Sequence, residues 1–229
     1  MHKKTLSERD ICTKFINPAL ANAGWDLRKQ VREEVSFTDG RIIVQGQLHT
    51  RGKRKRADYI LYYKPNVPIA IIEAKDNNHN VGDGMQQALE YSEILDIPFV
   101  FTSNGDSFLF HDKTLSSGEL EKEISLDDFP SPDDLWNKYL KIKEVNEPEV
   151  KKVIEQDYFA DDSNMSPRYY QQIAINRTVE AVARGRDRVL LVMATGTGKT
   201  YTAFNIIWRL WKSKKKERTE KVRAHLSLS

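Results

Sequence analysis

Two apolar segments joined by a short turn, at 56–75, constrain this chain more than any other stretch. The sequence there is R-A-D-Y-I-L-Y-Y-K-P-N-V-P-I-A-I-I-E-A-K. Both halves are rich in aromatic and β-branched residues, and Lys-Pro-Asn separates them, which predicts a β-hairpin. Side chains alternate between the two faces of a strand, so Glu73 and Lys75 share a face. Antiparallel pairing would bring Asp58 beside the end of the strand that carries Glu73.

Two carboxylates and an ammonium group at one strand end are suited to metal-assisted phosphodiester hydrolysis. Asp58 and Glu73 offer the hard oxygen ligands that Mg²⁺ prefers, and the carbonyl of Ala74 is a candidate third ligand. Lys75 would orient the attacking water or offset charge on the phosphate. An E-x-K pattern alone is more often two solvated charges. The Asp that opens the neighbouring strand and the apolar runs leading into both positions favour a catalytic site.

The spacing D-x(14)-E-A-K resembles the PD-(D/E)xK nuclease superfamily, with Asp58, Glu73 and Lys75 at its signature positions. Ala57 stands where a Pro often precedes the first Asp. The resemblance implies a restriction-endonuclease-like α/β core with a mixed sheet and a Mg²⁺-dependent DNA endonuclease. It also implies Glu8 as a candidate additional metal ligand, although a carboxylate in the first turn of a helix is better explained by the helix dipole.

Five cations occupy six positions directly before Asp58. A charge run is usually a solvated loop, but its place beside a phosphodiesterase centre favours contact with DNA phosphates as a second interpretation. The five residues are Arg51, Lys53, Arg54, Lys55 and Arg56.

After a polar turn, a helix is predicted at 85–95, in which Gln87 and Tyr91 lie four residues apart and share a face. One interpretation is that these two residues pack at the helix edge without a further function. Q-x(3)-Y also resembles a motif of the RecB-like and type I restriction branch of the superfamily. The resemblance implies that both residues support the active site and contact DNA.

The first domain is predicted to span 1–142 as a mixed α/β fold. Its first helix should run from Ser7, as N-cap, to Gly24, with Pro18 kinking or splitting it. One sheet should hold four strands, at 41–50, 58–63, 69–75 and 97–103. A further strand at 108–111 and a short helix at 135–142 are expected to follow.

Composition favours a reducing, cytoplasmic compartment. It has 229 residues and one cysteine, Cys12, which cannot form an internal disulfide. The N-terminus lacks the apolar core of a signal peptide, and no apolar run reaches membrane-spanning length. The net charge of +3, from 36 basic and 33 acidic residues, means that any nucleic-acid footprint must be local.

A polar segment at 143–165 is predicted to be a linker, and 166–229 carries a second set of motifs. An apolar strand expected at 189–193 leads into A-T-G-T-G-K-T and a helix, the context of a phosphate-binding loop. Backbone N–H groups there would hold ATP phosphates, Lys199 would pair with the β- and γ-phosphates, and the Thr200 hydroxyl would bind Mg²⁺. The loop residues are Gly196, Thr197, Gly198, Lys199 and Thr200.

The loop lacks the first glycine of G-x(4)-G-K-[ST], because Met193 stands there, and in this form it is similar to the helicase superfamily 2 loop. R-Y-Y-Q-Q-I-A, at 168–174, resembles the element that precedes that loop. The resemblance implies that Gln171 contacts adenine and that Tyr170 packs near the base. The alternative for the tyrosines is packing at the start of a helix.

In this order the motifs resemble the N-terminal part of the R subunit of type I restriction-modification enzymes. The resemblance implies an ATP-driven translocase that cleaves double-stranded DNA with modification and specificity subunits. The alternatives are a catalytically inactive nucleotide- or DNA-binding fragment and a repair-type nuclease of the same fold. Only the start of a RecA-like motor domain is present, so we expect 167–229 to be poorly ordered or packed on a partner, and ATP to bind weakly.

Overall fold

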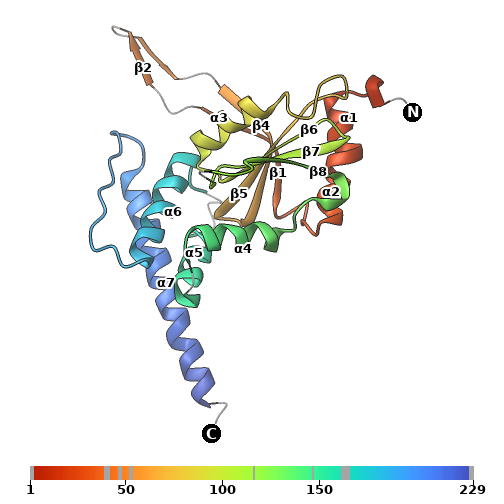
Figure 1. Ribbon diagram of the computed structural model, residues 1–229. Helices are drawn as coiled ribbons and strands as arrows, with labels where there is room; N and C mark the ends of the chain where they lie inside the picture. Colours follow the sequence, from red (N-terminus) through yellow and green to blue (C-terminus); the bar gives the residue numbers. More distant parts are fainter. Residues whose placement is uncertain are drawn as a thin grey trace. The chain divides into compact units, whose positions relative to one another are not determined.

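The computed structural model describes residues 3–38, 42–45, 48–51, 54–115, 117–145, 147–160 and 166–226. Side chains are described within these ranges up to Lys214, except at 42–45 and 48–51. The chain divides into two compact units, Met1–Lys143 and Glu144–Ser229 (Figure 1). Each unit is described by itself below.

The first unit is built on the mixed sheet that the sequence predicts. Its strand order is β1-β4-β5-β6-β7-β8, with β5 and β6 parallel and the other neighbours antiparallel. The strands are β1 Val31–Thr38, β4 Arg54–Lys64, β5 Val67–Ala74, β6 Phe99–Ser103, β7 Ser107–Asp112 and β8 Glu121–Ser125.

The predicted hairpin is confirmed as β4 and β5, which pair with Ile60 opposite Ile71. Seven of the eight β5 residues are buried and Pro68 is half-buried, so β5 is covered on both faces, as strands at the centre of a sheet are. Helix α3 (Met85–Leu95) packs on β5 and β6, and α4 (Pro132–Ile142) packs on β4 and β5. The predicted bounds of α3 are confirmed. Helix α4 begins at Pro132, three residues before the predicted start, behind a capping box of Ser131 and Asp134.

The first helical segment is split near Pro18, as predicted. Ser7 caps α1 (Glu8–Ile11), a single π-helical turn follows at Cys12–Ile16, and α2 (Asn17–Asn22) begins just before the proline. Proline has no N–H to donate, so the helical hydrogen-bond ladder is interrupted there. Gly24 has φ +89°, the left-handed conformation expected after a helix end.

The prediction of one sheet strand at 41–50 is wrong. Strands β2 (Ile42–Gln45) and β3 (Leu48–Arg51) pair only with each other. The sheet position beside β4 is taken by β1, where only Val31 and Phe37 are buried, so the sequence carries little alternation there. Strand β8 was not predicted for the same reason, since four of its five residues are exposed.

In the second unit, the described residues form helices α5 (Pro148–Glu155), α6 (Tyr169–Ala183) and α7 (Lys199–Leu226). Helix α5 lies inside the range 143–165 that is predicted to be a linker. Arg209 of α7, with 1% of its surface exposed, ties the helices together. It donates from Nη1 to Asn176 Oδ1 on α6 and from Nη2 to the Ile154 carbonyl on α5, both at 2.6 Å.

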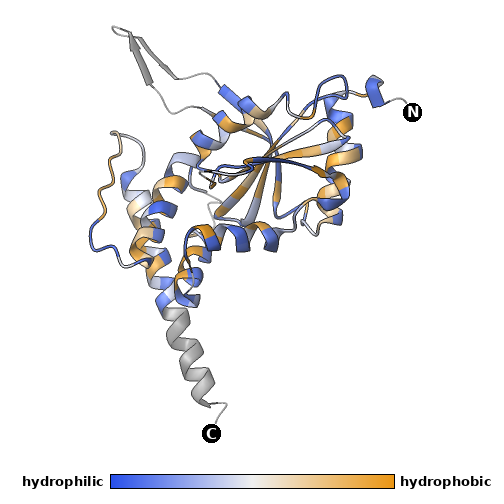
Figure 2. Ribbon diagram, in the orientation of Figure 1, coloured by the Kyte–Doolittle hydropathy of each residue, from blue (hydrophilic) through white to orange (hydrophobic). Residues whose placement is uncertain are grey.

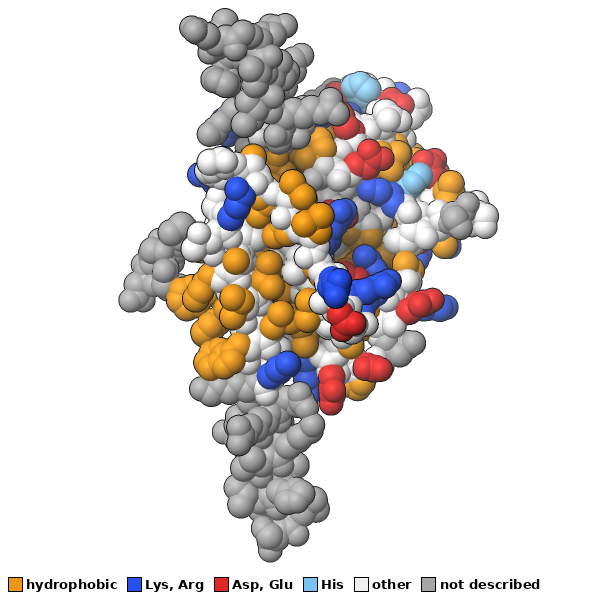
Figure 3. Space-filling view, turned by 90° about the vertical axis from the view of Figure 1, so that its left-hand side faces the viewer, with side chains coloured by type: hydrophobic (Ala, Val, Ile, Leu, Met, Phe, Trp, Pro, Cys, Tyr) orange, Lys and Arg blue, Asp and Glu red, His pale blue; other side chains and the backbone are white. Residues whose placement is uncertain are grey.

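The strand predicted at 189–193 is not formed, and its apolar residues are solvent-exposed. They form a hydrophobic stretch between α6 and α7 (Figure 2). Val192 is 84% exposed and Leu190 is 89% exposed. Hydrophobic side chains gather on the face drawn in Figure 3, and exposed ones of α7 include Phe204, Ile207 and Trp211. The expected poor order does not extend to the helices, which pack together. The apolar segment at 189–193, which needs neighbouring strands, is in neither a helix nor a strand.

Among the helices that the structure describes, none combines the length and apolar character that a membrane span requires.

Truncation of Phe101 tests how far the first unit depends on its aromatic core. Phe101 is fully buried on β6 and stacks on Phe110 at a centroid distance of 4.6 Å, with Phe129 at 4.8 Å. Phe101→Ala should lower the free energy of unfolding by about 3–5 kcal/mol in urea titrations. Leu120→Ala, at a residue that is 40% exposed, should change it by less than about 0.5 kcal/mol. Similar losses in the two variants would contradict this account of the core.

Candidate active site and candidate nucleotide loop

The hairpin brings Asp58 and the Glu73-Ala74-Lys75 segment together. Tyr59 pairs with Ile72, so the antiparallel register continues to Asp58 opposite Glu73. The Asp58 Oδ2 atom accepts a hydrogen bond from the Ala74 backbone N–H at 2.8 Å. Asp58 is thereby fixed against the peptide unit that follows Glu73.

Glu73 lies at the centre of the group, with only 2% of its surface exposed. Its Oε1 atom accepts hydrogen bonds from Lys75 Nζ at 3.0 Å and from Gln87 Nε2. Its Oε2 atom is buried and finds no hydrogen-bond partner among the residues that the structure describes. A buried carboxylate oxygen without a donor is costly, unless a cation or another donor binds it.

Burial and like charge disfavour ionisation of these carboxyl groups. Burial, followed by the Asp58 charge, raises the pKa of Glu73 to about 7. Burial also raises the pKa of Asp58, against the Ala74 hydrogen bond. The pKa of Glu8 is raised by partial burial and then by the charge of Asp58. Helix α1 therefore brings a third carboxyl group close enough to be affected by that charge. Burial acts to lower the pKa of Lys75, but Glu73 and the other carboxylates outweigh it, so that pKa is raised.

Gln87 and Tyr91 share a helical face, and this face is turned toward Glu73. Gln87 Nε2 contacts both Glu73 Oε1 and the Tyr91 hydroxyl, the latter at 3.2 Å. Tyr91 packs edge-on against Phe37 with a centroid distance of 5.2 Å. Gln87 therefore touches the candidate site directly, and Tyr91 is connected to it through Gln87.

The described part of the basic run is a strand and not a loop. Arg54, Lys55 and Arg56 open β4. Lys55 forms an ion pair with Glu90 and lies over the Tyr91 ring at 5.7 Å, so it is occupied in holding α3. The side chain of Arg51, whose backbone is in β3, and all of Lys53 lie outside the described residues.

The two arginines remain accessible. Arg54 donates to Ser36 Oγ at 3.0 Å, and Arg56 lies 3.7 Å from the Glu34 carboxylate. Both arginines are exposed, and both lie on β4 just before Asp58.

Glu34 is a residue near the site that sequence reasoning missed. It adopts φ +52°, a left-handed conformation that is rare outside glycine, in the middle of the edge strand β1. Its carboxylate lies 3.7 Å from Arg9 and 3.7 Å from Arg56, and its charge contributes to the raised pKa of Asp58. Two adjacent charged residues in an exposed strand do not indicate, from the sequence alone, that one of them has a left-handed conformation.

The donor set at the site suits a hard divalent cation. Asp58 and Glu73 offer carboxylate oxygens, and Ala74 offers a carbonyl. The Glu73 Oε2 atom is open, burial raises the pKa of both carboxyl groups, and the Asp58 charge further raises that of Glu73, so a bound cation would favour their ionised forms. Among the described side chains, no three His, Cys, Asp or Glu residues form a metal-binding group. Glu8 is therefore not gathered with Asp58 and Glu73 as a third carboxylate ligand in this arrangement.

In the second unit, the glycine-rich turn before α7 is formed without the predicted strand. Gly196 and Gly198 have φ +78° and +80°, which glycine adopts without strain. Thr197 Oγ1 donates to the Ala194 carbonyl at 2.6 Å, and Lys199 is the first residue of α7. The glycine-rich turn therefore leads directly into the N-terminus of α7.

Gln171 has a contact that the sequence did not predict. Its Nε2 atom donates to the Thr197 carbonyl at 2.9 Å, and its Oε1 atom accepts from the Arg168 backbone N–H at 2.9 Å. Both ends of the amide are therefore engaged in holding the turn against the start of α6. The Tyr170 hydroxyl accepts from Arg168 Nη1 at 3.2 Å.

Comparisons with known proteins divide the chain at a similar place. A family model described as type I restriction enzyme R protein N terminus matches residues 27–130. A second model, described as type III restriction enzyme, res subunit, matches residues 164–224.

The relatives are endonuclease subunits. The chain is 57% identical to the EcoAI type I restriction enzyme endonuclease subunit of Escherichia coli, over 95% of this chain and 27% of that protein. It is 26% identical to the EcoKI endonuclease subunit of Escherichia coli K12, over 94% of this chain and 22% of that protein. The chain thus spans about a quarter of the length of these relatives.

A solved structure agrees in fold. It is a fragment described as an HsdR subunit of a type I restriction enzyme from Vibrio vulnificus YJ016, with a TM-score of 0.77 and 41% identity. The match covers 91% of this chain and 39% of that one. The family model at 27–130, the identities and the fold agree in matching this chain to the N-terminal region of the R (HsdR) subunit of type I restriction enzymes.

Proposed function

We propose that the first unit is the Mg²⁺-dependent DNA endonuclease of a type I restriction system. The observation that carries the proposal is the convergence of Asp58, Glu73 and Lys75 at one strand end, with Glu73 buried and one of its oxygens open. The names of the relatives, which are endonuclease subunits, support the same activity.

Asp58, Glu73 and the Ala74 carbonyl would hold Mg²⁺. When bound, the ion supplies Lewis-acid polarisation of the phosphate and a water of lowered pKa. The chain's own part is to fix these oxygens. The Ala74 N–H holds Asp58, while Lys75 and Gln87 hold one Glu73 oxygen so that the other faces away from both donors.

Lys75 has a second role in this proposal. Its ammonium group is kept charged by the surrounding carboxylates, as its raised pKa indicates. A charged Lys75 beside the strand end can orient a water for attack and offset the negative charge that accumulates on the phosphate in the transition state. Gln87 and Tyr91 would hold Glu73 in place and line the approach of the DNA.

Double-stranded DNA would approach along the exposed start of β4. Arg54 and Arg56 present guanidinium groups there, and phosphate contacts of this kind contribute affinity without reading sequence. Lys55 is already paired with Glu90, so we assign it to holding α3 and not to DNA. Modification and specificity subunits are the partners expected of a type I restriction system.

For the second unit, we propose ATP binding at the Gly196–Thr200 loop. The formed turn and its place at the start of α7 support this proposal. Lys199 would pair with the phosphates and Thr200 with Mg²⁺. Contact of Gln171 with adenine would require its amide to leave Thr197 or Arg168, so we propose that its role in this chain is to shape the loop.

The alternative of an inactive nucleotide- or DNA-binding fragment is less well supported. All three signature residues of the nuclease are present: Lys75 binds Glu73, and Asp58 accepts from the Ala74 backbone N–H between them. A repair-type nuclease of the same fold is disfavoured by the match of 164–224 to a restriction-enzyme family model.

Replacing each signature residue should remove cleavage without unfolding the chain. Asp58→Ala, Glu73→Ala and Lys75→Ala should each reduce Mg²⁺-dependent nicking of plasmid DNA to background, because each removes a ligand or charge that the others cannot replace. Lys64→Ala, at an exposed lysine of the same hairpin, is the matched control and should cleave normally. Circular dichroism would verify folding. Cleavage that survives two of the three changes would refute the assignment.

Glu73→Gln should stabilise the metal-free protein at neutral and higher pH. The pKa of Glu73 is about 7 in the folded chain against an ordinary 4.5, so the folded state holds the proton more tightly. Stability should therefore fall as pH rises from about 4.5 to about 7. At pH 8, in the presence of a chelator, the glutamine variant avoids this loss and should be more stable by on the order of 3 kcal/mol.

The two proteins should be alike near pH 4, where Glu73 is protonated in both states. Urea titrations over a pH series provide the measurement. Added Mg²⁺ should stabilise the wild type more than Glu73→Gln, since ligand binding to the folded state adds to stability. Equal pH dependence of the two proteins would contradict the buried-carboxylate account.

Nucleotide binding should be weak and should depend on the packing of Gly198. A Cβ atom on Gly198 would collide with the Gln171 amide, and φ +80° strains any other residue. Gly198→Ala and Lys199→Ala should each abolish the residual ATP affinity measured by isothermal titration. Gly185→Ala is the control, because its φ is also +80° but no atom lies within 4 Å of its added Cβ. Tight, sub-micromolar binding by the 229-residue wild type would show that the loop needs no neighbouring strands.

A further inference from the structure

Helix α3 meets the candidate active site through a residue without a side chain. Gly84 is buried and immediately precedes Met85, the first residue of α3. A Cβ atom added to Gly84 would lie 3.0 Å from Cγ of Glu73 and 3.4 Å from Cε of Lys75. The first of these distances is tighter than most real Cβ contacts, so a side chain here would shift Glu73 or the start of α3 by a few tenths of an ångström.

Backbone conformation does not explain the glycine. Gly84 has φ −89° and ψ −5°, which residues with a Cβ also adopt. The remaining reason for a glycine is close approach, in this case of the helix start to the Glu73 side chain.

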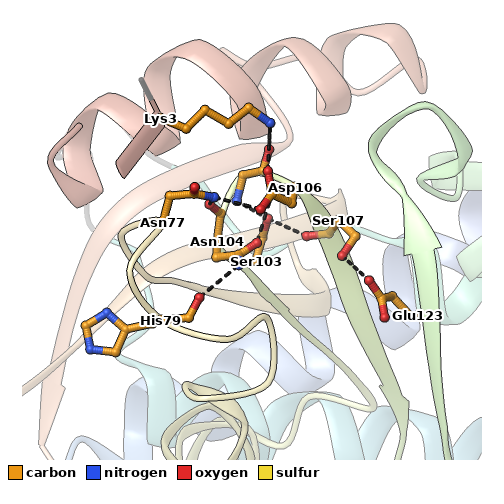
Figure 4. Close-up of polar contacts among 9 residues, drawn as sticks. Lys3, Asn77, His79, Ser103, Asn104, Asp106, Ser107 and Glu123 are labelled. Carbon is orange, nitrogen blue, oxygen red and sulfur yellow. Dashed lines mark hydrogen bonds and ion pairs between the residues drawn. The ribbon is translucent and has the colours of Figure 1, made fainter. Parts of the chain in front are cut away.

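Hydrogen bonds to other segments hold the loop at 76–84, so the loop cannot move away from Glu73 freely. The Asn104 side chain donates to the His79 carbonyl at 2.9 Å, and Asn77 donates to the Asn104 carbonyl at 3.1 Å and to Asp106 at 2.8 Å (Figure 4). Lys3 in turn donates to Asp106 at 2.8 Å. These contacts fasten the loop to the turn between β6 and β7.

The strand end is fixed as well. The Lys75 backbone N–H donates to the Ser103 carbonyl at 2.9 Å, and Met85 and Ala88 are buried just beyond Gly84. The space between Gly84 and Glu73 is thus bounded by two segments that are each fixed elsewhere.

We propose that Gly84 is a positioning residue of the nuclease site. Its bare backbone packs against Cγ of Glu73 and Cε of Lys75, and so limits the positions that the Glu73 carboxylate and its open Oε2 atom can take. The inference rests on the proposed function, because it assigns the geometry of a carboxylate that would hold Mg²⁺.

The test compares Gly84→Ala with Gly82→Ala in the full 229-residue chain. The control adds the same methyl group to the same loop with similar crowding, 3.1 Å from Leu109 Cδ2, but away from the carboxylates. In Mg²⁺-dependent DNA cleavage, Gly84→Ala should lower kcat by about 100-fold with KM for DNA unchanged, as expected of a small misplacement at a reacting centre. Gly82→Ala should retain wild-type activity.

Two measurements are independent of cleavage. Titration with Mn²⁺ alone, followed by electron paramagnetic resonance, should show weaker binding by Gly84→Ala than by Gly82→Ala. A double-mutant cycle on the free energy of unfolding should show that Gly84→Ala destabilises the wild type but has little effect in a Glu73→Ala background, where the Cγ atom is gone.

Additive stability effects, together with equal Mn²⁺ binding by the two glycine variants, would overturn the proposal. The cycle also covers the case in which Gly84→Ala folds poorly, since removal of the Glu73 Cγ should then restore folding. If the wild type does not cleave DNA at all, the proposed nuclease function fails, but the cycle still decides whether Gly84 acts through Glu73.

Discussion

The antiparallel pairing of β4 with β5 is the interaction on which the first unit depends. It places Asp58 at the start of one strand opposite Glu73 at the end of the other, and the Asp58–Ala74 hydrogen bond of 2.8 Å fixes the two strand ends. The buried apolar residues of β5 supply the stability that the polar strand end cannot. The buried Glu73 carboxylate lowers stability by itself, and it is tolerated because the strand that carries it packs on both faces.

The same arrangement explains why Glu73 is surrounded by fixed donors on one side only. Lys75 and Gln87 come from different elements, yet both bind the same oxygen. Satisfying both oxygens with protein donors would stabilise the metal-free state and weaken any cation site. The open oxygen and the raised pKa are therefore two aspects of one compromise between folding stability and ligand binding.

The sequence predicted the parts of the site that depend on short-range periodicity. The hairpin, the helix with Gln87 and Tyr91, and the strand face shared by Glu73 and Lys75 all follow from local spacing. What it could not predict depends on long-range pairing. β1 became the edge strand although it has only two buried residues, and Glu34 adopts its left-handed conformation within that strand. Gly84 lies in a sequence typical of a turn, which already explains a glycine. The close approach of Glu73 and Lys75 is a second reason for the glycine, and it is visible only in the structure.

The second unit shows more clearly which features need only local contacts and which need distant partners. The glycine turn needs only positive φ at Gly196 and Gly198 and the hydrogen bond from Gln171, all of which lie within this segment, and it is formed. The apolar run at 189–192 has the composition of a central strand, but a strand needs partners for its N–H and C=O groups on both edges. Among the described residues of this unit no strand offers such partners, and Leu190 and Val192 stay exposed. Composition sets which segment can become a strand, whereas available neighbours decide whether it does.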